Sequence, residues 1–147
     1  WESGAIMSYL ASKKPDSGLV PKDDKQKALV EQWQFWNTAQ FAPACGIYTY
    51  ESLVKKILEL GDPDPDEIAK ADENFNRYAT VLDDHLSDRD SLVGNSITIA
   101  DHAVGSNLIH AEPAGIPVEH YSNILRWWGN IVSTEAWQKA LAVIGNN

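Results

Sequence analysis

The sequence contains a single cysteine, Cys45, and few basic residues. One cysteine excludes an internal disulfide and a cysteine-based zinc site, and it suits a protein of the reducing cytosol. Lys and Arg number 12 against 21 Asp and Glu residues, which gives a net charge of −9 and no basic cluster. We therefore expect no nucleic-acid partner, because proteins that bind phosphate backbones present a basic face.

Long hydrophobic runs and metal-binding motifs are also missing. No segment approaches the roughly 20 apolar residues of a membrane-spanning helix, so no membrane partner is expected. The acidic run 62–67 lacks the EF-hand pattern and is interpreted as a solvated linker. No metal site is expected either, because neither H-x-x-x-H nor H-E-x-x-H spacing occurs among the histidines His85, His102, His110 and His120.

Apolar residues are present in helical rather than alternating order. They make up 44% of the chain, enough for a core, and they recur at intervals of three and four. This pattern predicts an all-α fold without strands. Pro43 interrupts the longest helical stretch, so a kink or two helices in series are expected near Ala42. The expected helices cover residues 2–13, 24–60, 67–86, 98–111, 119–132 and 134–144, with turns such as 112–117 between them. In the last two helices, Leu125 and Ile144 are among the side chains expected to face inward.

The sharpest local motif is Ser96-Ile97-Thr98-Ile99-Ala100-Asp101. Thr98 followed three residues later by Asp101 predicts a capping box at the start of a helix. Losing such a cap costs about 0.5–2 kcal/mol, so we interpret the motif as structural and not catalytic. His102 follows it and is interpreted as a packing partner of Ile97, while Cys45 is interpreted as a buried, unreactive thiol.

Two features allow either a structural or a binding role. Glu2 and Ser3 open the first helix, with Ser3 placed to cap it; the same helix start could hold a carboxylate while Glu2 holds an ammonium group. Such a site would fit the α-amino acid end of a peptide. Phe41, Tyr50 and Val54 lie along the long helix, where they could line an apolar groove or pack against a neighbouring helix.

Together these segments resemble the glutathione transferase family, most closely its bacterial members. Residues 1–11, WESGAIMSYLA, resemble the helix that ends the thioredoxin-like domain of the family. LVGNSITIADH resembles its buried capping box, and EQWQFWNTAQFAPA resembles the first helix of its helical domain. YSNILRWWGNIVSTEAWQKAL resembles the closing helices, although the family often has proline at the positions of Ser122 and Glu135.

The resemblance implies a glutathione-transferase C-terminal bundle of about five to six helices, preceded by one helix left from the thioredoxin-like domain. Residues 1–13 would be that last helix, 14–23 a linker, and 24–147 the helical domain. The rest of the thioredoxin-like domain, with the residue that activates the thiol, would precede Trp1. This chain would then contain no catalytic residue, and by itself it would lack activity.

The same resemblance assigns Glu2 and Ser3 to the γ-glutamyl end of glutathione, a co-substrate rather than a cofactor. The F-x-P segment places Phe41, Tyr50 and Val54 near the pocket for a small apolar electrophile. A cytoplasmic homodimer is implied for the full-length protein. Two alternatives stay open: a non-catalytic interaction module of the same fold, and a protein that stores apolar ligands without turnover.

Overall fold

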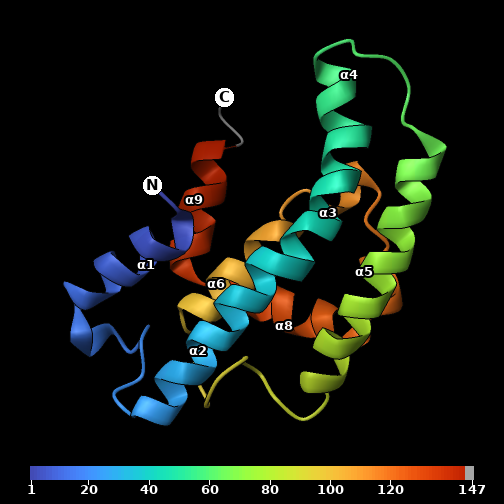
Figure 1. Ribbon diagram of the computed structural model, residues 1–147. Coiled ribbons are helices and arrows are strands. Elements are labelled where there is room, and N and C mark those ends of the chain that lie inside the picture. Colours follow the sequence, from blue (N-terminus) through green and yellow to red (C-terminus); the bar gives the residue numbers. More distant parts are fainter. Residues whose placement is uncertain (145–147) are drawn as a thin grey trace.

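The chain folds as an all-α bundle in a computed structural model that describes residues 1–144 (Figure 1). No strand occurs in that range, which confirms the predicted fold class. The α-helices are α1 (Ser3–Ser12), α2 (Asp24–Trp36), α3 (Ala42–Thr49), α4 (Lys55–Ile57), α5 (Pro65–His85), α6 (Ile99–Gly105), α7 (Ala111–Ala114), α8 (Ser122–Val132) and α9 (Glu135–Ile144). Short 3-10 turns are η1 (Pro15–Ser17), η4 (Ser106–Leu108) and η5 (Val118–His120).

The long helical run from α2 to α4 contains two π-helical turns, η2 (Asn37–Phe41) and η3 (Tyr50–Val54). Pro43 stands in the first turn of α3, directly after η2. Proline lacks an N–H and is tolerated at the first turn of a helix. The break expected near Ala42 is therefore present, as a widened turn that restarts the helix rather than as a loop.

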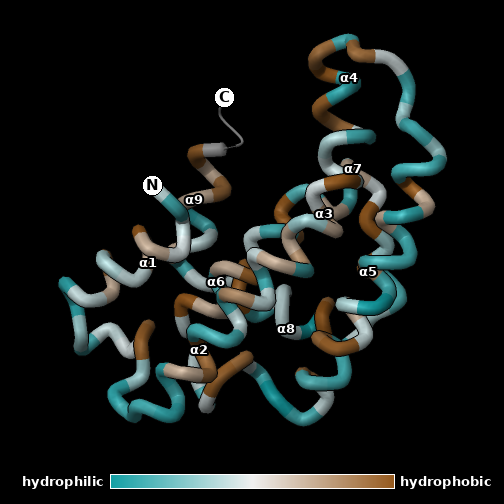
Figure 2. The backbone as a smooth tube through the Cα atoms, in the orientation of Figure 1, coloured by the Kyte–Doolittle hydropathy of each residue, from teal (hydrophilic) through white to brown (hydrophobic). Residues whose placement is uncertain are grey.

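Helix α5 packs against α3 and η2 of this run and has one buried face. Ala71, Phe75, Ala79 and Leu82 recur at intervals of three and four and are fully buried. Figure 2 shows hydrophilic and hydrophobic residues alternating along α5, as expected of a helix with one face in water. Asp64 caps the helix by accepting a hydrogen bond from the Asp66 amide at 2.9 Å.

Helix α6 lies in the centre of the bundle, among α1, α2 and α8 (Figure 1). Its glycine, Gly105, allows close contact with α8, because a Cβ there would lie 3.0 Å from the Trp128 ring. The predicted capping box is confirmed: Thr98 is the N-cap, and the Thr98 and Asp101 side chains bond each other's backbone. The fully buried Asp101 carboxylate also accepts hydrogen bonds from Leu92 N at 2.8 Å and Trp127 Nε1 at 2.9 Å.

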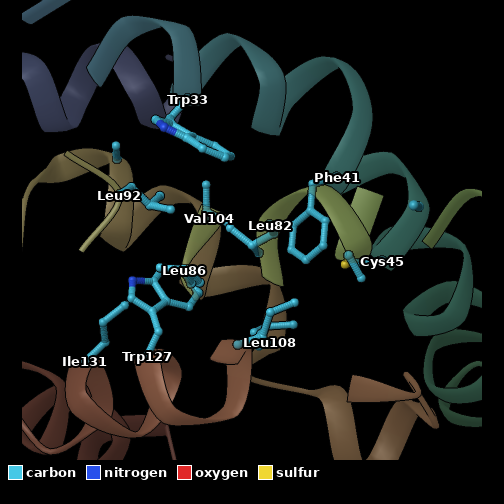
Figure 3. Packing of buried hydrophobic residues seen from close by; sticks show 14 of the residues in the cluster. Trp33, Phe41, Cys45, Leu82, Leu86, Leu92, Val104, Leu108, Trp127 and Ile131 are labelled. Atoms are coloured by element: carbon cyan, nitrogen blue, oxygen red, sulfur yellow. The ribbon is translucent and has the colours of Figure 1, made fainter. Parts of the chain in front are cut away.

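The core joins aromatic and aliphatic side chains from most of these helices, with none from α4. Figure 3 shows Leu82 between Val104 and Phe41, with Leu108 below them and Trp127 to the lower left. Cys45 is 2% exposed beside this cluster, as predicted. Burial raises the pKa of its thiol to about 12, so it carries no thiolate at neutral pH and has no role as a nucleophile.

The structure corrects three predictions of local structure. Residues 111–114 form the short helix α7, where the sequence predicted only a turn after Ala111. Leu125 was expected to face inward but is 41% exposed. Ser3 is not the cap of α1: Glu2 occupies that position, and the helix start has no side-chain cap. The inward orientation expected for the Ile144 side chain falls outside the described part of the structure.

Candidate functional site

A cleft of about 660 Å³ opens where the N-terminus of α1 meets η2, α3, α6, η4 and α9. Its apolar walls contain Met7 from α1, Ala42 and Pro43 from α3, and Ala136, Trp137 and Ala140 from α9. Its polar lining comes from Glu2, Ser3, Asn37, Thr38, His102, Ser106 and Asn107. In Figure 1 the chain start lies beside α9, with α6 beneath both. This mixture of apolar walls and a few polar groups is typical of a small-molecule site.

Glu2 and Ser3 both line this cleft, as the binding interpretation requires. Glu2 has φ 68° and ψ 111°, a conformation that is rare for a residue with a side chain. Strained backbone of this kind concentrates at functional sites. No side chain caps the start of α1, so the first amides of the helix stay available to an anion.

The proposed apolar-pocket residues occupy three different environments. Phe41 is fully buried and stacks on Trp36 at 5.3 Å between ring centroids, one residue before Ala42 in the chain. Tyr50 is 47% exposed, and the Lys55 ammonium lies 5.9 Å from its ring centroid. Val54 is half-buried at the end of η3. None of the three lines the cleft, so their substrate contact stays a prediction.

The cleft includes polar residues that sequence reasoning missed, above all His102. The Trp137 Nε1–H donates a hydrogen bond to His102 Nδ1 at 2.9 Å, which joins α9 to α6. Burial lowers the pKa of His102, and the neighbouring Asp101 carboxylate opposes part of this shift. His102 follows the capping box directly, and we interpreted it as a packing residue.

A second polar link joins further lining residues of the cleft. Asn107 Nδ2 donates to Asn37 Oδ1 at 2.8 Å, and Asn37 Nδ2 donates to the Ala103 carbonyl at 3.3 Å. These bonds connect the π-helical turn η2 to η4 and α6. Because π-helical turns often occur at functional sites, the position of η2 supports the assignment of the cleft as the site.

The described residues contain neither a candidate metal site nor a candidate membrane-spanning helix. In residues 1–144, no group of three or more His, Cys, Asp or Glu side chains could hold a metal ion. None of the helices in that range is long and apolar enough to span a membrane.

Comparison with known proteins identifies relatives along the whole chain. The profile of the family described as "Glutathione S-transferase, C-terminal domain" matches residues 41–135. The "Glutathione S-transferase hmp2" of Hypomyces subiculosus is 32% identical over 97% of this chain and 69% of its own length. The "Probable glutathione S-transferase GSTF2" of Oryza sativa subsp. japonica is 25% identical over 98% of this chain and 68% of its own length.

Solved structures show the same fold. Glutathione transferase F2 from Populus trichocarpa superimposes with a TM-score of 0.88 at 23% identity, covering 100% of this chain and 71% of its own. A structure of glutathione S-transferase III in apo form gives 0.87 at 30% identity, covering 97% of this chain and 67% of its own. The chain thus spans about two thirds of these relatives. It belongs to the glutathione S-transferase family, of which it contains the C-terminal helical domain.

Proposed function

We propose that this chain is the helical part of a cytoplasmic glutathione transferase, which joins the glutathione thiolate to an electrophilic apolar compound. Residues 1–13 are the last helix of a thioredoxin-like domain, 14–23 the linker, and 24–147 the helical domain. The thiol-activating residue lies outside this chain, which contributes contacts to both substrates. The full-length protein acts as a homodimer.

One observation carries the proposal: Glu2 and Ser3 open into the same cleft as the apolar walls from α3 and α9. The uncapped amides of α1 suit the α-carboxylate of the γ-glutamyl group, because a helix start attracts anions. The Glu2 carboxylate suits the α-ammonium of the same group. A peptide held there would extend into the cleft and bring its sulfur toward the apolar compound.

The apolar compound would lie against Ala42, Pro43, Ala136, Trp137 and Ala140. Phe41 would support this wall by its stacking on Trp36. Tyr50 and Val54 lie further along the same helical run, and we retain them as the outer part of the pocket. Small side chains on α9 leave room for an aromatic or branched substrate.

A titration of the 147-residue chain with glutathione tests the contact directly. We expect shifts of the NMR amide signals of Ser3, Gly4 and Ala5, and none at the buried Asp101. The α-linked peptide Glu-Cys-Gly is the matched control, because the α-carboxylate of its glutamyl residue is consumed in the peptide bond and is no longer free to bind the start of α1. Equal shifts with both peptides would contradict the γ-glutamyl assignment.

Retention on immobilised glutathione, measured on the chain joined to its own upstream segment, tests the role in the larger protein. Ser3→Ala is expected to reduce retention, whereas Ser8→Ala, on the exposed side of α1, is expected to leave it unchanged. If neither variant reduced retention, the chain would act instead as an interaction module without the glutathione contact.

A further inference from the structure

His102 lies on the floor of the cleft, between α1 and α9. His102 and Met7 also line a second, smaller cavity, so both residues border two hollows. The ring centroid is 6.2 Å from that of Trp137, and the rings are tilted by 32°. Trp137 in turn packs edge-on against Trp128 at 5.1 Å. The position of the imidazole is therefore set by an aromatic chain that reaches α8.

The bond from Trp137 determines which nitrogen of His102 carries the proton. An indole N–H only donates, so His102 Nδ1 must accept. In the neutral imidazole the remaining proton then lies on Nε2. Within residues 1–144, His102 Nε2 has no hydrogen-bond partner, which leaves an N–H donor at the floor of the cleft.

The other side-chain donors that α2 to α9 place on the cleft are already engaged. Each donor atom bonds a protein acceptor: Thr38 Oγ1 to Gln34 O, Asn37 Nδ2 to Ala103 O, Ser106 Oγ to Ala103 O, Asn107 Nδ2 to Asn37 Oδ1, and Trp137 Nε1 to His102 Nδ1. Among these donor atoms, in the described part of the chain, only His102 Nε2 bonds no protein acceptor; the Asn37 amide also keeps a second N–H beyond its bond to Ala103 O. Since the His102 Nε2–H opens to the cleft without a protein acceptor, an acceptor on the ligand can bond it.

Burial, rather than the nearby charged groups, favours a neutral His102 ring. Asp101 precedes it, but its carboxylate accepts hydrogen bonds from Leu92, Thr98 and Trp127 inside the core. Glu2 lines the same cleft from α1, while Lys13 and Lys14 line the cavity on the other side. The α3 and α9 walls contribute uncharged residues. With burial disfavouring the imidazolium, the ring is neutral at pH 7.

From this geometry we infer that His102 Nε2–H donates a hydrogen bond to an oxygen of the second substrate. The cleft therefore selects apolar compounds that carry a carbonyl-type oxygen over hydrocarbons of the same shape. His102 is a specificity-determining residue on this inference. The inference rests on the proposed function in one respect, that the cleft is the pocket for the second substrate.

Two unreactive probes of nearly equal shape test this selection: benzophenone, which has the ketone oxygen, and diphenylmethane, which lacks it. Binding to the 147-residue chain is measured by NMR titration, with the Trp137 indole signal as reporter. His102→Leu is expected to weaken benzophenone binding about three- to tenfold, the range for one net hydrogen bond. Diphenylmethane binding should change less than about twofold, because it has no acceptor.

His102→Gln is the conservative variant, since one amide atom can accept from Trp137 while the other donates into the cleft. It should restore benzophenone affinity. His120→Leu is the matched control, because the His120 side chain is 73% exposed outside the cleft. If His102→Leu weakened both probes equally, or if neither probe bound the unaltered chain, the inference would be overturned.

The tautomer provides a second measurement that does not depend on a variant. Long-range nitrogen–proton NMR spectra at pH 7.5 should show His102 protonated on Nε2 and unprotonated on Nδ1. A proton on Nδ1 would overturn the inference. Glutathione shifts at Ser3 report separately on the proposed function, so ketone selection without glutathione binding would refute that function and leave the His102 assignment standing.

Discussion

The N-termini of α1 and α6 contain similar chemistry in opposite settings. At α6, Thr98 and Asp101 bond each other's backbone, and Asp101 is fully buried. At α1, Glu2 and Ser3 are exposed and no side chain caps the helix. A helix start whose polar groups are all satisfied within the protein stabilises the fold, whereas one left open can bind a ligand. The same contrast separates the buried polar cluster of the core from the polar lining of the cleft.

Other helix starts fall between these extremes. The α8 start is capped from a distance, since Asp83 on α5 accepts hydrogen bonds from Asn123 N at 2.9 Å and Ile124 N at 3.0 Å. Near the start of α5, Glu51 on η3 accepts from Asp64 N at 2.7 Å and pairs with Lys55 at 2.5 Å. If the comparison is right, substitutions at the starts of α6, α8, α5 and α1 should differ in how much, and in what way, they change stability and binding.

The largest effect is expected for Asp101→Ala. The substitution leaves the buried Leu92, Thr98 and Trp127 donors without their acceptor, and each unmet donor carries a desolvation cost. The free energy of unfolding should fall by about 3 kcal/mol or more. A loss of stability of that size should lower the Tm by about 6 to 12 °C. Thermal denaturation followed by circular dichroism measures this, and an unchanged Tm would refute the structural role of the box.

Asp83→Ala should have the next largest effect. It removes the cap of α8, which contains the fully buried Ile124, Trp127 and Ile131. Loss of a helix cap costs about 1–2 kcal/mol, so urea unfolding should shift by that amount. Asp84→Ala, at an exposed neighbouring position of α5, is the matched control and should shift stability much less.

The effect of Glu51→Gln on the stability of the fold should depend on pH. The Asp64 amide and then Lys55 lower the pKa of Glu51. A carboxyl group with a lowered pKa in the folded state contributes stability above its unfolded pKa, and this contribution is lost as pH falls through the folded value. The stability difference between the parent chain and the variant should therefore be present at pH 7 and shrink toward pH 3. A difference independent of pH would show that the charge of Glu51 has no part in it.

Ser3→Ala should have the smallest effect on stability, within about 0.5 kcal/mol. The reason is that Ser3 does not cap α1. The same substitution is expected to weaken glutathione binding, which Asp101→Ala should not do directly. A large loss of stability in Ser3→Ala would erase the distinction between the two helix starts.

Much of the fold could be predicted because the determining contacts are local. The buried stripe of α5 and the Thr98–Asp101 box each lie within a few turns of helix, so spacing and residue type are sufficient. Leu125 was misassigned because periodicity locates a face without saying what covers it. Helix α7 was missed because four residues carry too short a pattern to distinguish a helical turn from a loop.

The candidate site was predictable only in part, for the same reason. Glu2 and Ser3 stand together in the sequence, and their chemistry can be read there. Asn37, His102 and Trp137 lie far apart in the chain and meet only after folding. None of the three belongs to a motif that would have identified it.

The sequence by itself determined the longer helices, the box that starts α6 and the polar pair at the chain start, whereas the absence of a side-chain cap there came from the structure. These depend on backbone hydrogen bonds and spacing within one segment. Only the tertiary structure decided that Asp83 caps α8 and that Asn37 bonds Asn107. It also decided that Trp137 sets the proton position on His102. Each of these contacts joins residues on different helices, and their distances follow from how the helices pack rather than from any local preference.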